Sequence, residues 1–302
     1  MTRIVNNCVA LVCLCLFWGQ SLRAADASHS EQIKWGNESV FNEEHNTLGL
    51  FSGVLGGQIV LAGGTSDDYS RWGRNAVCLS ENAGFALYED MLSKPLAYGA
   101  SITLSDGILC IGGRDSSQCY EDVFFVTMQQ GKLNVSEDWP PLPFPLSNAA
   151  GALLDNKVYL FGGRKSVSPS RLSDSFFVLD LSNKSRGWKE LPGYPGCVRE
   201  DAILVVQNNG VSPCLYLLGG QTETEEGLSS CLTDGYVYNP QLGKWSSLGS
   251  DFPKGICAAV ASGANHILLF QKEPEDTQHL KKENALWKYH TITPVSYTHL
   301  TL

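Results

Sequence analysis

Short apolar runs that end in two glycines recur along this chain. The first is Ile59-Val60-Leu61-Ala62-Gly63-Gly64, and equivalent runs end at Gly112-Gly113, Gly162-Gly163 and Gly219-Gly220. Successive glycine pairs are 49, 50 and 57 residues apart. Apolar runs of this length, bounded by turn residues, are typical of buried strands. The pattern predicts a chain of strand-rich repeats, each about fifty residues long.

Each repeat contains signals for three further strands. A polar loop leads to a second apolar segment, as at residues 122–126 and 174–180, and then to an outer strand marked by an aromatic residue such as Trp139 or Trp188. A segment of small residues follows, as expected for an innermost strand that crowds around an axis. Four strands per repeat of about fifty residues predict an all-β, kelch-type β-propeller.

Two departures from the repeat bear on how the ring closes. The fifth repeat reads Phe270-Gln271-Lys272 where the others have their glycine pair, and Trp35 is in phase with the outer-strand aromatics. We therefore expect a strand around residues 33–41 to be the outer strand of the last blade, which removes open sheet edges. The repeat tryptophans are expected to pack between blades; a sugar-stacking platform is the alternative.

The N-terminus has the pattern of a secretory signal. Arg3 is followed by an apolar run over residues 8–18 and by small residues near Ala24. Residues 1–24 are therefore predicted to be a signal peptide, which places the protein in the periplasm or outside the cell. The apolar run is too short to span a bilayer, so no membrane span is expected after cleavage.

Charge and cysteine content exclude several partner classes. The net charge is −9 over 302 residues and no Lys/Arg stripe occurs, so nucleic-acid binding is not expected. There is no Cys/His cluster with zinc spacing, so we infer no metal site. Seven cysteines follow residue 24. Cys119 is a possible disulfide partner of Cys110, and Cys231 of Cys214; buried free thiols are the alternative.

The starts of the innermost strands supply the candidate site. Segments 96–100, 146–150, 198–202 and 254–258 align, and their large polar residues are expected to point into the mouth of the central channel. These residues are Tyr98, Asn148, Arg199, Glu200 and Lys254.

Several of these segments resemble one bacterial family. Leu96-Ala97-Tyr98-Gly99, Pro195-Gly196-Cys197-Val198-Arg199-Glu200-Asp201-Ala202 and Tyr289-His290-Thr291-Ile292-Thr293 are similar to the N-acetylneuraminate epimerases, in particular the cyclically permuted mutarotase-like branch. The resemblance covers roughly residues 48–293. It implies a six-bladed kelch propeller, exported to the periplasm, which converts the α-anomer of a sialic acid to the β-anomer without a cofactor.

The same resemblance predicts an incomplete ring. Residues 294–302 resemble a translated sequencing adapter, so the propeller is expected to occupy residues 25–293 and to show about five blades. The proton-accepting glutamate of the family lies in a Gly-Glu-x-x-Pro-Gly-x-Arg stretch that has no match here. We expect this chain to lack that residue.

Exchange of anomers needs a base at the anomeric hydroxyl and an acid at the ring oxygen. Arg199 is the first candidate for holding the substrate carboxylate, because an arginine fork matches that group; a blade-edge ion pair with Glu200 or Asp201 is the alternative. Tyr98, Asn148 and Glu200 are further substrate-binding candidates. The competing function is a non-catalytic propeller that binds glycans or proteins.

Overall fold

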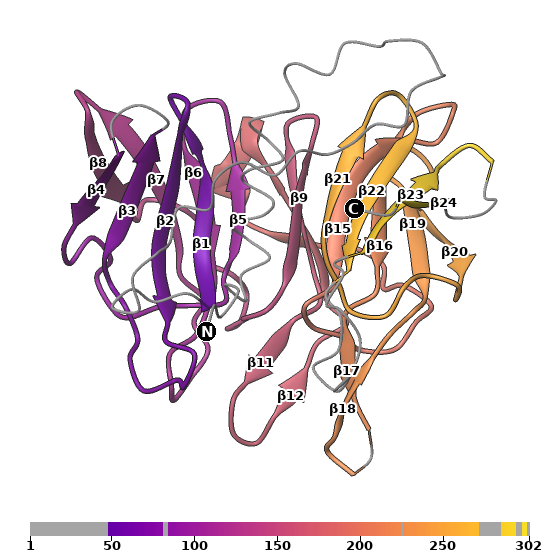
Figure 1. The fold of residues 1–302 in the computed structure, drawn as a ribbon, viewed down its shortest axis with the longest axis horizontal. Coiled ribbons are helices and arrows are strands. Elements are labelled where there is room, and N and C mark those ends of the chain that lie inside the picture. The colour runs from indigo at the N-terminus through magenta and orange to yellow at the C-terminus, as the bar shows by residue number, and fades with distance from the viewer. Residues whose placement is uncertain (1–47, 81–83, 225, 272–284, 294–297, 301–302) are drawn as a thin grey trace.

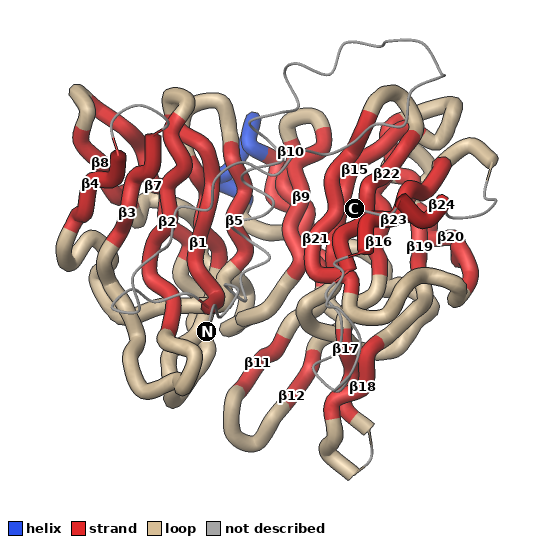
Figure 2. The backbone as a smooth tube through the Cα atoms, viewed as in Figure 1, coloured by secondary structure: helices blue, strands red, loops and turns tan. Residues whose placement is uncertain are grey.

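The computed structural model describes residues 48–80, 84–224, 226–271, 285–293 and 298–300. The regular secondary structure of these residues is β-strand, apart from one short 3₁₀ helix, η1 (Leu181–Arg186), and turns and loops connect the strands, as Figure 2 shows. The strands make five four-stranded antiparallel sheets. Each sheet is one repeat of the sequence, so the predicted all-β propeller architecture is confirmed as an arrangement of five blades (Figure 1).

The strands of each blade run from the axis outward in chain order. Blade 1 contains β1 (Leu48–Leu55), β2 (Gln58–Thr65), β3 (Ala76–Ser80) and β4 (Gly84–Tyr88). Blade 2 contains β5 (Ala100–Thr103), β6 (Ile108–Ile111), β7 (Val123–Gln129) and β8 (Lys132–Ser136). Blade 3 contains β9 (Ala150–Leu154), β10 (Lys157–Phe161), β13 (Phe176–Asp180) and β14 (Lys189–Glu190). Blade 4 contains β15 (Ile203–Asn208), β16 (Pro213–Leu218), β19 (Gly235–Asn239) and β20 (Lys244–Gly249). Blade 5 contains β21 (Ile256–Ser262), β22 (His266–Gln271), β23 (Ala285–His290) and β24 (Thr298–Leu300).

Two small hairpins extend blades 3 and 4 beyond the sheets. The first pairs β11 (Arg164–Ser166) with β12 (Arg171–Leu172), and the second pairs β17 (Gln221–Glu223) with β18 (Ser229–Cys231). Each begins directly after a glycine pair, and both project from the lower end of the molecule in Figure 1. The loops that follow the glycine pairs therefore build this end of the propeller.

The glycine pairs join each blade to the start of the next. Gly113 donates a backbone hydrogen bond of 2.8 Å to the Leu146 carbonyl, which lies just before β9. Gly112 has a φ of +63°, and a Cβ there would lie 2.2 Å from the same carbonyl oxygen. Only glycine combines this left-handed conformation with so close an approach of two backbones.

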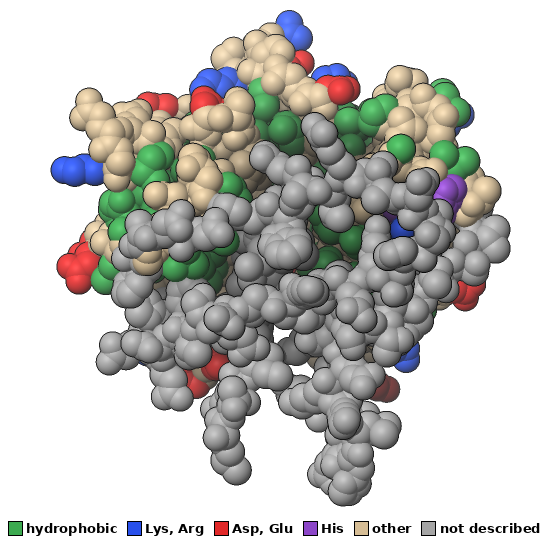
Figure 3. All heavy atoms as spheres, turned by 45° about the horizontal axis from the view of Figure 1, so that its top comes forward, with side chains coloured by type: hydrophobic (Ala, Val, Ile, Leu, Met, Phe, Trp, Pro, Cys, Tyr) green, Lys and Arg blue, Asp and Glu red, His purple; other side chains and the backbone are tan. Residues whose placement is uncertain are grey.

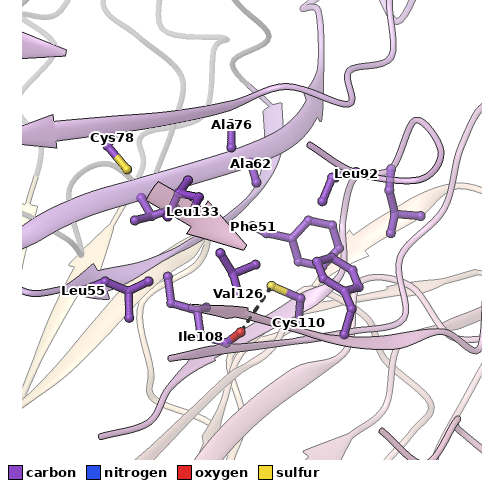
Figure 4. Close-up of a cluster of buried hydrophobic side chains, with 13 residues drawn as sticks. Phe51, Leu55, Ala62, Ala76, Cys78, Leu92, Ile108, Cys110, Val126 and Leu133 are labelled. Atoms are coloured by element: carbon purple, nitrogen blue, oxygen red, sulfur yellow. Dashed lines mark hydrogen bonds between the residues drawn. The ribbon is translucent and has the colours of Figure 1, made fainter. Parts of the chain in front are cut away.

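Hydrophobic cores lie between successive blades. The innermost strands contact one another in the order β1, β5, β9, β15, β21. Figure 4 shows the core between blades 1 and 2, where Phe51 from β1 meets Cys110 and Val126 from β6 and β7. Blades 2, 3 and 4 therefore bury a face against each of their two neighbours.

The repeat tryptophans pack between blades, as expected. Trp245 of blade 4 lies against Phe176 and Phe161 of blade 3, with ring centroids 5.0 and 5.9 Å away. Trp188 of blade 3 donates from its indole to the Pro140 carbonyl of the neighbouring repeat at 3.0 Å. Two placements differ from the prediction: Trp139 follows the end of β8, and Trp188 lies directly before β14, so neither lies within its outer strand.

The disulfide hypothesis is wrong, because all seven cysteines in the described part of the chain are free. The Cys110 thiol points into the core of Figure 4, toward the Ile108 carbonyl at 3.9 Å. The Cys119 sulfur lies instead 3.5 Å from the Ser147 hydroxyl. Cys214 is buried whereas Cys231 is exposed on β18, so each hypothetical pair has its two thiols in different surroundings.

Several expectations concern residues outside the described ranges. The signal peptide at residues 1–24 and the closing strand around residues 33–41 lie there, and so does most of the segment 294–302. The six-blade count and ring closure remain predictions. Among the residues that the structure describes, no helix has the length and apolar character needed to cross a membrane.

Candidate functional site

The backbone pairing shows which residues are equivalent where each inner strand begins. The carbonyls of Leu96, Leu146 and Arg199 each accept a hydrogen bond from the second glycine of the preceding blade, at 2.8–2.9 Å. The alignment of the repeats in the sequence instead matches Val198 to Leu96 and Leu146. That alignment is therefore shifted by one residue in blade 4. Asp201, and not Glu200, is therefore the counterpart of Tyr98 and Asn148.

These three residues form what we call the axial chain: Tyr98, Asn148 and Asp201. All three have left-handed backbone conformations, with φ of 60°, 55° and 52°. The backbone N–H of Asn148 donates to the backbone carbonyl of Tyr98 at 2.6 Å, and the backbone N–H of Asp201 donates to the backbone carbonyl of Asn148 at 3.0 Å. The side chain of Asn148 also donates to the Asp201 carboxylate at 2.9 Å. Three successive blades thus bring one polar side chain each to the axis.

Arg199 does not face this site, which corrects the prediction for it. Its side chain is fully buried, because the residue occupies the core position that Leu96 and Leu146 occupy in other repeats. Its guanidinium holds both carboxylate oxygens of Asp234 at 2.7 and 2.8 Å. It also donates to the Gly219 carbonyl and the Tyr194 hydroxyl, both at 2.8 Å. The arginine fork is committed to the protein's own carboxylate.

Glu200 is also committed to an ion pair. Its side chain is 8% exposed, and its carboxylate accepts from Arg164 at 2.8 and 2.5 Å. Arg164 also binds Glu223 at 2.9 Å and contacts Ser170 at the tip of the first hairpin. This group joins the two hairpins, and we call Arg164, Glu200, Glu223 and Ser170 the hairpin cluster. Lys254, the remaining predicted residue, is exposed.

Arg114 is the site residue that sequence reasoning missed. Its guanidinium carbon lies 4.7 Å from the ring centre of Tyr98 and 5.1 Å from that of Trp72. Its only side-chain hydrogen bond among the described residues is a long one, 3.4 Å, to the Asp115 carbonyl. No carboxylate of the described residues lies within ion-pair distance of it. The signal was present, because Arg114 and Arg164 each directly follow a glycine pair.

Asp201 is held by two amides. Besides the bond from Asn148, its second oxygen accepts from the Gln221 side chain at 2.7 Å. The surrounding inner ends of the blades displace water around the carboxylate, which raises its pKa above the ordinary 3.8. Its side chain nevertheless remains exposed to solvent at the surface of the site. A carboxylate in these surroundings exchanges protons at a higher pH than one at an open surface.

The hairpin cluster yields a pH-dependent prediction. Glu223→Gln is expected to lower the free energy of unfolding at pH 7 by at most about 1 kcal/mol, because partly exposed ion pairs are weak. Glu223 is 29% exposed, and its hydrogen bonds from Ser170 and Arg164 lower its pKa from the ordinary 4.5. A lowered pKa stabilises the folded state above the unfolded-state value, and this contribution disappears as pH falls through the folded value.

Urea unfolding at several pH values measures this effect. The difference between wild type and Glu223→Gln should be constant above the ordinary pKa of 4.5 and shrink below it. The exposed Glu190→Gln is the matched control and should show no such change. A difference that persisted unchanged at low pH would contradict the assigned role of the Glu223 charge.

The sequence of this region is similar to known proteins. Residues 139–273 match the family model of N-acetylneuraminate epimerase. The chain is 30% identical over 139 residues to N-acetylneuraminate epimerase of Yersinia pestis (strain Pestoides F), covering 44% of this chain and 33% of that protein. It is 31% identical over 131 residues to the enzyme of that name from Haemophilus influenzae (strain PittEE), covering 43% and 32%.

A third relative is described by its repeat type alone. A Kelch domain-containing protein of Vibrio cholerae serotype O1 is 30% identical over 141 residues, covering 46% of this chain and 36% of that protein. The chain thus spans about a third of the length of the curated relatives that it matches. Over residues 139–273, the chain is similar to the N-acetylneuraminate epimerases, which confirms the resemblance that its repeats and motifs indicated.

Proposed function

We propose that this protein is a sugar isomerase, a mutarotase that acts on N-acetylneuraminate or a related acidic sugar. The matched relatives carry the name N-acetylneuraminate epimerase, and the match includes the segments that supply Asn148, Arg164 and Asp201. Export to the periplasm, predicted from residues 1–24, is part of the same proposal.

The observation that carries the proposal is the uncommitted guanidinium of Arg114. Arg164 and Arg199 each bind carboxylates of the protein, whereas Arg114 stacks on Tyr98 and Trp72 and has no such partner among the described residues. An arginine held by aromatic rings presents its planar fork in one orientation, which suits bidentate binding of a carboxylate. In sialic acids the carboxylate is bonded to the anomeric carbon, so this contact would position the reacting centre.

The axial chain supplies the polar groups beside that anion site. Tyr98 contacts Arg114 on one side and is linked through Asn148 to Asp201 on the other. The reaction breaks the bond between the anomeric carbon and the ring oxygen, and closure on the opposite face of the carbonyl gives the other anomer. No redox step or group transfer is required.

The proposal is tested by following anomer exchange by nuclear magnetic resonance, starting from a single anomer that has been freshly released or dissolved. The protein is expressed from the complete gene. The wild type should bring the anomers to equilibrium faster than buffer does. Arg114→Ala should reduce kcat/KM for anomer exchange by about 10- to 100-fold, since a hydrogen bond to a charged group contributes about 1.5–3 kcal/mol. Arg114→Lys should restore only part of this, because lysine keeps the charge but lacks the fork.

The exposed Arg186→Ala is the matched control and should behave as wild type. Wild-type protein that binds the sugar without accelerating anomer exchange would support the non-catalytic binding propeller instead. An Arg114→Ala variant with unchanged kcat/KM would overturn the assignment of the carboxylate site.

A further inference from the structure

We propose that Tyr69 is a specificity-determining residue whose ring packs against the apolar face of a sugar ring, while Arg114 binds the carboxylate of the same molecule. The inference rests on the proposed function and deepens it, because it names the feature of an acidic sugar that the site selects. Three observations support it: the Tyr69 ring is exposed, it lies next to Tyr98, and the loop that carries it is fixed by hydrogen bonds.

The Tyr69 ring lies open to solvent beside the anion site. It is 51% exposed, and it is the one exposed aromatic side chain among those whose burial the structure describes. Its hydroxyl oxygen lies 3.4 Å from that of Tyr98, and the centre of the Tyr98 ring lies 4.7 Å from the guanidinium carbon of Arg114. Tyr69 and Arg114 are therefore both neighbours of Tyr98, so a ligand held by Arg114 lies close to the Tyr69 ring.

Trp72 sets the position of Tyr69 relative to the other groups of the site. Its indole N–H donates to the Tyr69 carbonyl at 3.1 Å. The Trp72 ring also lies edge-on to that of Tyr98, with centroids 6.3 Å apart, and 5.1 Å from the guanidinium carbon of Arg114. One tryptophan thus contacts the backbone of Tyr69, the ring of Tyr98 and the proposed carboxylate holder.

The loop that carries Tyr69 is fixed before any ligand binds. The Asp68 carboxylate accepts from the hydroxyls of Ser66 and Ser70 at 2.5 and 2.8 Å, and from the Ser70 backbone N–H at 3.0 Å. The Tyr69 backbone N–H donates to the Ser66 carbonyl at 2.9 Å. Tyr69 has a φ of +58°, a left-handed conformation that an aromatic residue keeps only where its surroundings impose it. A ring held in one orientation loses little conformational entropy on binding.

The chemistry of these groups matches a cyclic sugar acid. A pyranose ring presents C–H bonds on its faces and hydroxyls around its edge. The Tyr69 ring offers an apolar surface to the C–H bonds, and the hydroxyls of Tyr69 and Tyr98 can each donate to and accept from sugar hydroxyls. The Arg114 fork binds the carboxylate. A small carboxylate without a sugar ring would bind at Arg114 alone, so Tyr69 distinguishes sugar acids from small keto acids.

Two ligands separate the roles of Tyr69 and Arg114. N-acetylneuraminate has both a sugar ring and a carboxylate, whereas pyruvate, a keto acid without a sugar ring, is the probe for the anion site alone. Dissociation constants for both are measured by nuclear magnetic resonance titration of the protein expressed from the complete gene. Tyr69→Ala should weaken N-acetylneuraminate binding by about 3- to 10-fold, the range expected for a contact as strong as an aromatic pair, and should leave pyruvate binding unchanged. Arg114→Ala should weaken the binding of both ligands.

Two further variants complete the test. Tyr69→Phe keeps the ring and should retain most of the affinity for N-acetylneuraminate. Leu228→Ala is the matched control, because Leu228 is a 63% exposed apolar residue between β17 and β18, in a hairpin at the same end of the propeller. It should bind both ligands as the wild type does.

Each outcome bears on one of the two proposals. Unchanged N-acetylneuraminate binding in Tyr69→Ala, or an equal loss of pyruvate binding, would overturn the role of Tyr69. If Arg114→Ala still weakened both ligands in that case, and the wild type accelerated anomer exchange, the proposed function would stand. A wild type that bound the sugar with the expected dependence on Tyr69, but did not accelerate anomer exchange, would overturn the isomerase and keep Tyr69 as the residue that selects the sugar ring.

Discussion

Replacing Arg199 by leucine is expected to lower the free energy of unfolding by about 3–5 kcal/mol, as removal of one partner of a buried ion pair does. The variant would remove the hydrogen bonds that Arg199 donates to the Asp234 carboxylate, the Gly219 carbonyl and the Tyr194 hydroxyl. The carboxylate would keep the hydrogen bond from the Tyr236 hydroxyl. Burial opposes the charge of Asp234, but the Arg199 guanidinium overrides it and keeps the pKa of Asp234 low. Urea unfolding of the two proteins measures the loss.

A double variant tests whether the loss of stability comes from the unpaired Asp234 carboxylate or from the change of side chain at residue 199. Leu146 of blade 3 is equivalent to Arg199 of blade 4. Ser175 is likewise equivalent to Asp234, because the backbone carbonyl of each accepts a hydrogen bond from the first glycine of its repeat. Arg199→Leu combined with Asp234→Ser should therefore regain most of the stability, because buried ion pairs are often replaceable by apolar contacts. The exposed Arg186→Leu is the control. A double variant as unstable as the single one would contradict the assignment of the loss to the uncompensated carboxylate.

The blade architecture was predictable because its determinants are local. Apolar runs, glycine pairs and outer-strand aromatics recur in the sequence itself, and each has one structural requirement. The glycine of a pair approaches a carbonyl of the next repeat, as Gly112 approaches Leu146. The tryptophan fills the space between two blades, as Trp245 does against Phe176. Such features can be identified in a sequence without knowledge of any particular partner.

The site was harder to predict, because a shift of one residue in the alignment of the repeats moves a side chain from the core to the axis or the reverse. Matching Val198 to Leu96 put Glu200 at the position of Tyr98, and both Arg199 and Glu200 were predicted to point into the mouth of the channel. The backbone pairing instead places Asp201 at the axis and Arg199 in the core. The apolar pattern gave no warning, since the core position that is leucine in two repeats is an arginine here, made tolerable by Asp234.

The residue after each glycine pair shows why the residue type alone does not tell whether an arginine side chain is free to bind a ligand. Arg114 and Arg164 occupy it in successive repeats, and Gln221 occupies it in the next. Arg164 is bound by two glutamates from blade 4 and its hairpin, whereas Arg114 meets only aromatic rings and a backbone carbonyl among the described residues. The difference arises from side chains more than thirty residues away, which the spacing of a repeat does not reveal. Figure 3 shows Lys, Arg, Asp and Glu side chains interspersed along the upper part of the face that it draws, which is not the end of the molecule where the hairpins project.

The glycine pairs lead to a second strong prediction about stability. Gly112→Ala is expected to lower the free energy of unfolding by about 3–5 kcal/mol, the sum of left-handed strain and of forced displacement in a packed region. The added Cβ would lie 2.2 Å from the Leu146 carbonyl oxygen, which also accepts the hydrogen bond from Gly113. Relief of that contact requires blade 2 to move relative to the start of blade 3, so the loss falls on the junction between blades.

Gly131→Ala is the matched control, because it has the same kind of backbone without the contact. Gly131 has a φ of +75° in the turn between β7 and β8, and a Cβ added there would have nothing within 4 Å. This variant should lose only about 1–2 kcal/mol, the left-handed strain alone. The difference between the two variants in urea unfolding thus isolates the approach of the two backbones. Equal losses would mean that the glycine pair is required for its conformation alone, and that the junction between blades tolerates a side chain.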